Sequence, residues 1–501
     1  MAVAGPESKS RLVKRLLLLV FAIAFPLAAA ETTAIRWEPF EPAAGSAPLL
    51  AELGRLTVPL RRDAPTAGSA ELAFVRLRMP GGRGGAPIVY LAGGPGTSGI
   101  GVARNPYAIP SLKRLAGIGD VILLDQRGIG ASSPIPVCPP KPLPPHARFR
   151  PRTESMPRIV DETRACVAEW AAKGVDVRGF TVAESAADVE ALRVGLGVPK
   201  VNLVAHSYGT HLALATIRAH PSSIERAALI ATAGMNQMRK LPLVLDVQLA
   251  KLSALARTDP SIGDEVPDMT ALLRRVLAKL EKEPMKVTVR DRARKEKVEV
   301  AIGPEALQGM LALDVGDGND FPVFPALLLT IERGDPSILA WFVDKRYNQV
   351  SAISLMAFGM RCSAGATADR ERQIAQEAKI SIFGHAQSGA YPEVCTALPA
   401  SMDLGDAYRA KFFSEVPVLF LSGTLDSNTP PYQAEEIRWS MPNARHLIVE
   451  YAGHEDLEPN EEVQRAIADW LAGTDVSSRS VAFPPPDFKS VEEAKRDRRV
   501  E

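Results

Sequence analysis

The sequence VNLVAHSYGTHLALATIRAH occupies residues 201–220 and changes its pattern at Ser207. Residues 201–205 are almost entirely apolar, as in a strand buried on both faces of a parallel sheet. Residues 208–220 have helical spacing, which Pro221 ends. A sharp strand-to-helix turn lifts a serine hydroxyl clear of the sheet edge. We therefore predict that Ser207 is a nucleophile, with an ordinary helix-capping serine as the alternative.

The neighbours of Ser207 suit such a turn. The turn brings backbone segments close together, so small residues are needed two positions before and two after the serine. Gly209 meets this need, and Ala205 adds one methyl group where glycine is usual. A helix beginning at Tyr208 would direct free N–H groups and its positive dipole end toward the serine. We therefore predict that the Tyr208 amide forms half of an oxyanion hole.

A glycine-rich loop follows an earlier apolar strand. Residues 88–91 are apolar and lead into Ala92-Gly93-Gly94-Pro95-Gly96. Glycine lets the backbone come close to a substrate carbonyl, and proline stiffens the loop. We predict that the Gly94 amide is the second oxyanion donor. A plain tight turn is the alternative.

The other members of a hydrolase triad should follow the serine in the order acid, then histidine. Asp426 comes after the apolar run 416–422, and His454 comes after the run 445–449. Sites of open parallel sheets gather at the C-terminal ends of strands. We therefore predict a triad in which His454 takes the proton of Ser207 and Asp426 orients the imidazole. A capping aspartate and a surface histidine are the alternatives.

Short apolar runs alternate with helical patterns on both sides of Ser207, which indicates a mostly parallel sheet covered by helices. The alternation breaks over residues 236–415, where amphipathic helical patterns dominate. We predict an α/β-hydrolase fold with an inserted, mainly helical cap domain. The predicted divisions are core residues 31–235, cap residues 236–415, core residues 416–476, and a loosely packed tail at residues 477–501.

The first thirty residues are typical of a targeting segment. Positive residues at 9–15 precede an apolar run at 16–29, and Ala28-Ala29-Ala30 is a small-residue cleavage site. The run is shorter than the about 20 apolar residues of a membrane span. We predict a signal peptide at residues 1–30 and an exported protein, periplasmic or secreted, without a stable membrane span after cleavage. An uncleaved anchor is the alternative.

Export affects how the four cysteines, Cys138, Cys166, Cys362 and Cys395, are interpreted. They show no C-x-x-C spacing, so we expect no zinc site. In an oxidising compartment an even number favours disulfides, and four cysteines allow three pairings. Pairing by proximity would join Cys138 to Cys166 and Cys362 to Cys395. Free buried thiols are the alternative.

The composition is that of an ordinary globular protein, with 46% hydrophobic and 23% charged residues among 501. The formal net charge of +1 argues against a nucleic-acid partner. We expect a peptide or small ester as substrate, and no cofactor or metal. The sequence gives no indication of an oligomeric state.

Several motifs resemble those of the proline iminopeptidase and tripeptidyl aminopeptidase family of α/β hydrolases. They are Thr57-Val58-Pro59-Leu60, Gly93-Gly94-Pro95-Gly96, residues 125–132, His206-Ser207-Tyr208-Gly209, residues 422–426, and Gly453-His454. Together they extend over about residues 50–475. The resemblance implies a secreted exopeptidase that releases residues from the free N-terminus of a peptide. It also implies that residues 125–132 brace the catalytic loops.

Two positions depart from the family pattern. Ala92 stands where the family often has a polar residue, and no acid follows Cys362 closely. An acidic cap side chain is what the α-ammonium group of a peptide would need. The cap has acids at Asp314, Asp317 and Asp320, which we interpret as solvated loop residues. An esterase with the same triad is therefore the alternative function. A non-catalytic binding protein would lack a triad member, and none is missing.

Overall fold

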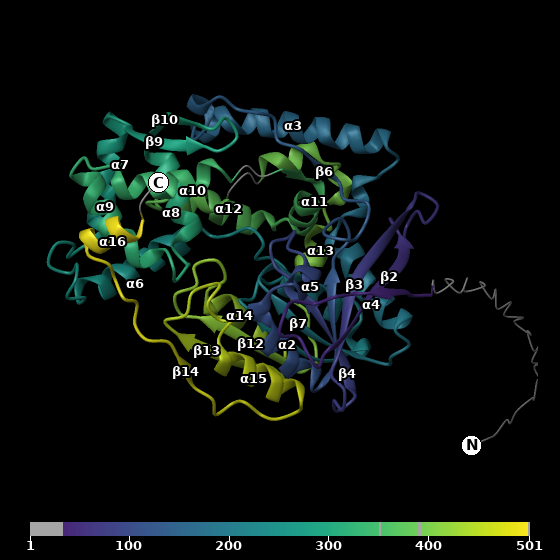
Figure 1. Cartoon of the computed structure of the whole chain (residues 1–501). Helices are drawn as coiled ribbons and strands as arrows, with labels where there is room; N and C mark the ends of the chain where they lie inside the picture. The colour runs from purple at the N-terminus through teal and green to yellow at the C-terminus, as the bar shows by residue number, and fades with distance from the viewer. Residues whose placement is uncertain (1–33, 350–351, 389–391, 499–501) are drawn as a thin grey trace, which may run out of the picture. The chain divides into compact units, whose positions relative to one another are not determined.

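The computed structural model describes residues 34–349, 352–388 and 392–498, and the predicted signal peptide lies outside them. In this part of the chain, ten strands form one sheet in the order β1-β2-β3-β5-β4-β7-β8-β12-β13-β14 (Figure 1). The strands are β1 (Arg36–Pro39), β2 (Leu50–Pro59), β3 (Ser69–Arg78), β4 (Gly85–Leu91), β5 (Gly119–Asp125), β7 (Val201–His206), β8 (Ile224–Ile230), β12 (Val418–Gly423), β13 (Arg445–Glu450) and β14 (Val481–Ala482). From β5 to β14 all neighbours are parallel, while β1, β2, β3 and β5 pair antiparallel.

Helices cover both faces of the sheet, which explains why its central strands are apolar throughout. Successive strand residues point to opposite faces, so Phe74 and Val89 belong to one apolar cluster and Val75 and Ile88 to another. The first cluster is completed by α4 (Val182–Gly195), α5 (Tyr208–Ala219) and α14 (Pro431–Arg438). The second is completed by α1 (Gly99–Ala103), α2 (Ile109–Ala116) and α15 (Glu461–Leu471).

Between β8 and β12 the chain leaves the sheet and builds a separate apolar cluster. The cluster includes residues of α6 (Leu243–Arg257), α7 (Met269–Lys282), α8 (Pro304–Asp314), α9 (Phe324–Glu332) and α10 (Ser337–Tyr347). The same segment of the chain also contains α11 (Leu355–Ala364), α12 (Ala368–Glu377) and α13 (Gly405–Arg409). A hairpin of β9 (Met285–Asp291) and β10 (Glu296–Ile302) interrupts this helical segment. Buried and exposed residues alternate along β9, which is the pattern of a strand. The prediction of a mainly helical segment did not take this alternation into account. We interpret residues 236–415 as the cap.

Part of the segment assigned to the first half of the core packs with the cap instead. The long helix α3 (Arg152–Ala172) and the short strand β6 (Val137–Cys138) precede α4 in the chain. Strand β6 pairs with β11 (Ile353–Ser354) from the cap segment. A small apolar cluster joins these elements to Leu355 and Met402. The chain therefore enters the cap region twice, which local sequence patterns did not reveal.

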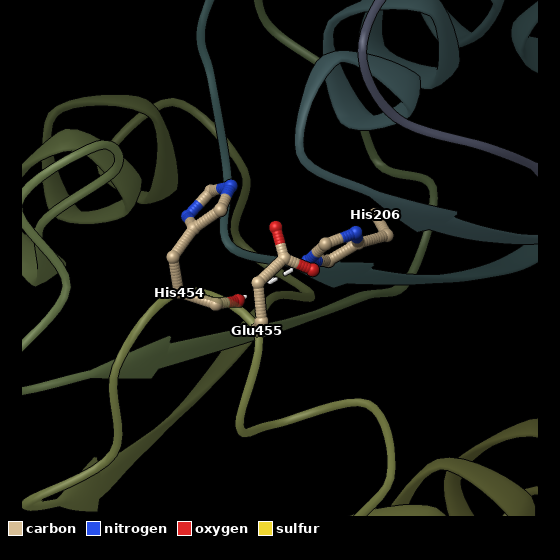
Figure 2. A group of neighbouring side chains, drawn as sticks. All are labelled: His206, His454 and Glu455. Atoms are coloured by element: carbon tan, nitrogen blue, oxygen red, sulfur yellow. Dashed lines mark hydrogen bonds between the residues drawn. The ribbon is translucent and has the colours of Figure 1, made fainter. Parts of the chain in front are cut away.

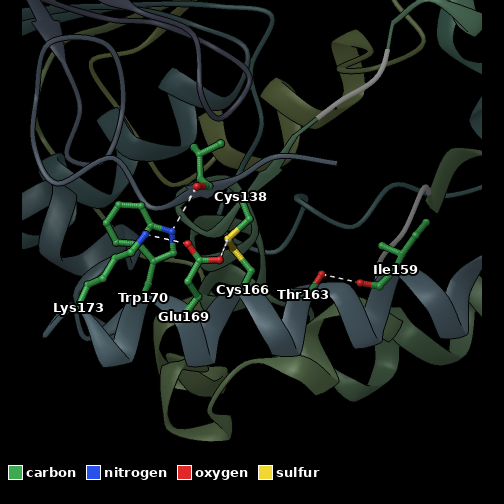
Figure 3. Close-up of a disulfide and its surroundings, with 8 residues drawn as sticks. Cys138, Ile159, Thr163, Cys166, Glu169, Trp170 and Lys173 are labelled. Atoms are coloured by element: carbon green, nitrogen blue, oxygen red, sulfur yellow. Dashed lines mark hydrogen bonds and ion pairs between the residues drawn. A yellow bond between two sulfur atoms is a disulfide. The ribbon is translucent and has the colours of Figure 1, made fainter. Parts of the chain in front are cut away.

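The four cysteines form the two pairs that are nearest in sequence. Cys138–Cys166 joins β6 to α3, and Cys362–Cys395 joins α11 to a short 3-10 turn. Figure 3 shows a second link beside the first disulfide, where the Trp170 indole N–H of α3 donates to the Val137 carbonyl at 3.3 Å. Both bridges lie outside the main sheet, so they fix the peripheral segments rather than the strands that carry Ser207.

The prediction of a loosely packed C-terminal tail is wrong for the part that the structure describes. Strand β14 extends the sheet beside β13, and α16 (Val491–Asp497) packs on α9 (Figure 1). Phe488 and Ala494 are buried in the apolar cluster of the cap. The few apolar residues of this proline-rich segment attach it to the rest of the protein, so their wide spacing does not indicate disorder. None of the helices in the described ranges combines the length and apolarity needed to cross a bilayer.

The loop after β5 is a brace built on two buried charges. The Asp125 carboxylate accepts hydrogen bonds from the Ser98 hydroxyl at 2.6 Å and the Ala131 amide at 2.8 Å, which ties the loop after β4 to the loop after β5. Arg127 is completely buried and donates to both carboxylate oxygens of Asp188 at 2.6 Å. It also donates to the carbonyl of Gly179 at 2.6 Å. These contacts indicate that the loop after β5 has a structural role.

Replacing Arg127 with methionine is expected to lower stability by about 3–5 kcal/mol, because Asp188 would keep a buried charge with much of its compensation removed. The shift of the chemical-unfolding midpoint measures this loss. Arg164→Met is the matched control, since the Arg164–Asp161 ion pair is exposed and should contribute less than about 1 kcal/mol. Equal shifts for the two variants would contradict the assignment of Arg127 as a brace.

Candidate active site

Ser207 occupies the strand-to-helix turn between β7 and α5. Its backbone has φ 53° and ψ −121°, a conformation that is uncommon for a residue other than glycine and that is often found at functional sites. The Ser207 amide donates to the Ile230 carbonyl of β8 at 2.9 Å, which holds the turn against the sheet. A Cβ atom at position 209 would lie 1.9 Å from the Leu91 carbonyl oxygen, so only glycine can stand there. Ala205 is fully buried and its single methyl group is accommodated.

The structure brings Ser207, His454 and Asp426 together from three separate loops. His454 Nε2 lies 2.9 Å from Ser207 Oγ, and His454 Nδ1 lies 2.9 Å from Asp426 Oδ2. Asp426 follows β12 and His454 follows β13, so both lie beyond the C-terminal ends of parallel strands, as expected. The arrangement is that of a nucleophile, a base and a residue that orients the base.

Thr429 is a contributor that the sequence analysis missed. Its hydroxyl donates to Asp426 Oδ2 at 2.6 Å and lies 3.2 Å from His454 Nδ1. The amides of Asn428 and Thr429 donate to Asp426 Oδ1 at 2.7 and 2.9 Å. This side-chain-to-backbone turn is common when aspartate is followed by asparagine or threonine, so the segment 426–429 contained a usable signal.

Electrostatics favour an ionised Asp426 paired with His454. Burial opposes ionisation of Asp426, but the charge and hydrogen bond of His454, with two hydrogen bonds from Thr429, bring its pKa down to about 2. Burial also lowers the pKa of His454, yet the Asp426 charge and hydrogen bond outweigh burial and raise that pKa above its usual value. The His454 amide donates to the carbonyl of Gly316 in the cap at 2.9 Å. The imidazole is therefore held by Asp426 of the core, and the backbone of His454 is held by the cap.

The two amides expected to stabilise an oxyanion lie beside Ser207. Tyr208 is the first residue of α5, so its amide has no carbonyl one turn earlier to bind. Gly94 has φ 106°, which favours glycine, and it lines two cavities together with Ser207. A Cβ atom at position 93 would lie 3.1 Å from Ser207 Cβ, so this loop passes directly over the nucleophile. The Arg361 guanidinium of α11 donates to the Gly94 carbonyl at 3.0 Å.

Ser207 lines two cavities that differ in charge. One has a volume of about 590 Å³ and is lined by His454 and by the carboxylates of Glu455 and Glu458. The other has a volume of about 290 Å³ and is lined by Arg239, Lys240 and Arg361. Of these five charged residues, the sequence analysis had selected none.

The interpretation of the cap acids as solvated loop residues is wrong for two of the three. Asp314 and Asp320 are each only 3% exposed, and they pair with Arg346 and Lys345 of α10. Asp317 is half-buried and accepts a hydrogen bond from the Asn319 amide at 2.9 Å. All three stabilise the loop whose Gly316 carbonyl binds His454. None of the three lines either cavity at Ser207.

His454 also belongs to a group of possible metal ligands, shown in Figure 2 with His206 and Glu455. His206 Nε2 lies 3.2 Å from the His454 carbonyl oxygen. Both ring nitrogens of His454 already face Ser207 and Asp426. A metal ion would have to displace one of those contacts, so we interpret the group as part of the serine-centred site.

Two families of known proteins match parts of this chain. Residues 86–275 match the family described as the alpha/beta hydrolase fold, and residues 381–481 match the family described as TAP-like protein. Serine protease Hip1 of Mycobacterium tuberculosis is 29% identical over 187 residues, which are 35% of this chain and 35% of that protein. Tripeptidyl aminopeptidase of Streptomyces coelicolor is 30% identical over 186 residues, which are 35% of this chain and 34% of that protein. The aligned stretch therefore spans about a third of the length of these relatives.

Among solved structures, a proline iminopeptidase of Mycobacterium smegmatis is 15% identical, with a TM-score of 0.39, and the match covers 85% of this chain and 100% of that chain. The predicted fold class and the predicted family resemblance are both confirmed by the matching families. The chain has an α/β-hydrolase fold, and its residues 381–481 are similar to the TAP-like family.

Proposed function

We propose that the protein is a serine hydrolase that cleaves acyl bonds through an acyl-enzyme formed at Ser207. The observation that carries this proposal is the continuous chain of two 2.9 Å contacts from Ser207 Oγ through His454 to Asp426. His454 accepts the serine proton as Oγ attacks the substrate carbonyl, and then donates a proton to the leaving group. Asp426 holds the imidazole tautomer and stabilises the imidazolium. In the second half of the reaction, His454 takes a proton from water as the water attacks the acyl-enzyme, and returns it to Ser207 Oγ as the acyl group leaves.

The oxyanion of the tetrahedral intermediate would accept hydrogen bonds from the Gly94 and Tyr208 amides. Gly94 belongs to a loop that passes over Ser207, and Tyr208 begins α5. Both donors are backbone groups that are fixed before the substrate arrives, so they need no reorganisation during the reaction. The positive dipole end of α5 favours the same charge.

We propose that the substrate is a peptide and that the enzyme releases residues from its free N-terminus. The relatives named tripeptidyl aminopeptidase support this assignment. The α-ammonium group needs a carboxylate, and in this chain Glu455 and Glu458 line the 590 Å³ cavity beside Ser207. Tyr90 donates to Glu458 at 2.6 Å and so orients its carboxylate. Acidic residues of the core would thus bind the α-ammonium group that an acidic cap residue binds in the family that this chain resembles.

We also propose that the protein acts after export. Both disulfides are compatible with an oxidising compartment, in which a bridged pair persists.

In the proposed enzyme, the cap, residues 236–415, would admit peptides to Ser207 while excluding bulk water.

Ser207→Ala is expected to abolish hydrolysis, because no other group would form the acyl-enzyme. Asp426→Asn should lower kcat by about 10⁴-fold, since the imidazole would lose the partner that sets its tautomer. Steady-state rates on aminoacyl anilides and on short acyl esters measure both effects. Cleavage of esters but not of anilides would favour an esterase. Undiminished turnover by Ser207→Ala would exclude the proposed mechanism.

The pH profile should report on His454. The base is active only when neutral, so kcat/KM should rise with pH through the pKa of His454, which Asp426 holds above its usual value of about 6.5. In Asp426→Asn the largest raising charge is absent, and burial is opposed only by the smaller effect of Glu455, so the acidic limb should move to lower pH. If the acidic limb of the kcat/KM profile does not move, it reports the titration of a group other than His454.

Glu455→Gln/Glu458→Gln is expected to lower kcat/KM for a free-amine alanyl anilide by about 10- to 100-fold, the effect of losing a charge-assisted hydrogen bond. The N-acetylated anilide lacks the ammonium group and should lose much less. Glu462→Gln, at an exposed site on α15, is the matched control. Equal losses on the two substrates would remove the two glutamates from amine recognition.

A further inference from the structure

The smaller cavity beside Ser207 has a one-sided charge that the proposed hydrolysis does not use. Its lining includes Arg239, Lys240 and Arg361, and no residue that lines it is an aspartate or glutamate. Arg239 forms an ion pair with Glu371 at 2.9 Å, which offsets its charge. The other two cationic residues of the lining are Lys240 and Arg361.

Of the cationic residues that line this cavity, Lys240 is the one whose charge has no hydrogen-bond or ion-pair partner among the described residues. Burial is the main cause that lowers the pKa of Lys240 to about 7; the charge of Asp426 opposes this shift, and the charges of Arg370 and Arg361 add to it. Holding a partly desolvated cation beside other cations is unfavourable, and a bound anion would relieve that cost.

A second polar group in the same lining also has no partner. The Tyr208 side chain is 2% exposed, and its hydroxyl forms no hydrogen bond with any residue that the structure describes. Burial raises the pKa of this hydroxyl well above its usual value, so it stays protonated and can donate. Arg361 lowers the pKa of Tyr208, which means that the guanidinium charge acts at the hydroxyl. Buried polar groups in proteins normally have partners, and an incoming acceptor would supply one.

Arg361 links this cationic lining to the reacting centre. Its guanidinium donates to the carbonyl of Gly94, the residue whose amide we assign to the oxyanion hole. The cavity contains Ser207 itself and has a volume of about 290 Å³, which is at the small end for a ligand site. A group bound there would share the cavity with the hydroxyl-bearing residue Ser207.

We propose that Lys240, with Arg361 beside it, binds a carboxylate of the substrate in this cavity. The proposal rests on the proposed hydrolysis at Ser207 and adds a substrate class to it, namely short peptides with a negative charge close to the scissile bond. The carboxylate has two possible sources with the same chemistry. It is either the side chain of an acidic residue on the acyl side, or the free C-terminus of a short leaving peptide.

Lys240 could instead act only through the field that it exerts on Asp426 and His454. The charge of Lys240 lowers the pKa of His454, so its removal could change catalysis without any contact to substrate. Such a role would affect anionic and neutral substrates alike. Binding of a carboxylate would affect only the anionic ones, so the ratio of the two rates separates the roles.

The test compares matched substrate pairs with the wild type and with Lys240→Met. One pair is glutamyl and glutaminyl anilide, which differ in charge on the acyl side. The other is trialanine and trialanine amide, which differ in charge at the leaving side. We expect the wild type to prefer the anionic member of one pair by about 10- to 100-fold in kcat/KM, as for one charge-assisted hydrogen bond. In Lys240→Met this ratio should fall toward one, and Lys240→Arg should retain most of it.

Lys251→Met is the matched control. Lys251 also feels the charge of Asp426, but it donates to the Thr424 carbonyl at 2.9 Å and lines a different cavity. Its loss should leave the anionic-to-neutral ratio unchanged. The proposal is overturned if the wild type shows no preference in either pair, or if Lys240→Met keeps the preference.

Binding to the Ser207→Ala variant gives a readout that does not depend on turnover. Calorimetry should show tighter binding of the preferred carboxylate compound than of its neutral match, and Lys240→Met in the same background should abolish the difference. Such binding without cleavage by the wild type would support the carboxylate site and refute the proposed hydrolysis. Cleavage of both members of each pair at equal rates would support the hydrolysis and refute the site.

Discussion

The position of Ser207 depends on how closely α5 approaches β4. Gly209 lies against the Leu91 carbonyl, at a distance that leaves no room for a Cβ atom. Leu91 is the last residue of β4 and leads directly into the loop of Gly93 and Gly94. One backbone contact therefore sets both the height of the nucleophile and the position of the loop that passes over it. A larger residue at 209 would move the two apart, because close-packed backbone cannot yield without shifting the helix.

The cap is joined to this arrangement at each of the loops that surround Ser207. The Gly316 carbonyl accepts the His454 amide, and the Gln248 amide group of α6 donates to the Leu425 carbonyl beside Asp426 at 2.7 Å. Arg361 of α11 donates to the carbonyl of Gly94. Each bond crosses from the segment 236–415 to a different loop of the core. The geometry around Ser207 is thus a property of both parts, and a change in the cap can alter it without touching substrate.

Local patterns in the sequence were sufficient for the parts of the site that depend on one segment each. The apolar run of β7 and the helix after Ser207 identify the turn, and the order of strands places Asp426 and His454 at the same sheet edge. Thr429 was missed because its role lies in side-chain contacts, although its spacing from Asp426 is that of a familiar turn.

Other features depend on contacts between distant segments, which spacing does not encode. Asp314 and Asp320 read as loop acids because their partners stand on α10, more than two turns of helix further along the chain. The packing of α3 with the cap follows from pairing between β6 and β11, two residues long in each strand. Lys240 belongs to no motif, and only the folded structure shows that it lines the same cavity as Ser207.

The charged residues of the two cavities that Ser207 lines have the signs that the proposed acyl transfer would develop. During attack on a carbonyl, the histidine becomes positive and the carbonyl oxygen becomes negative. Glu455 raises the pKa of His454, so the acidic side favours the imidazolium. Lys240 and Arg361 line the cavity that also holds Tyr208 and Gly94, the residues assigned to the oxyanion. In the proposed hydrolysis, the charges that would orient a peptide with an amine at one end and a carboxylate near the other would also favour the charges of the transition state. The two kinds of charge are not independent, because the charge of Lys240 also lowers the pKa of His454 and so opposes the imidazolium that Glu455 favours.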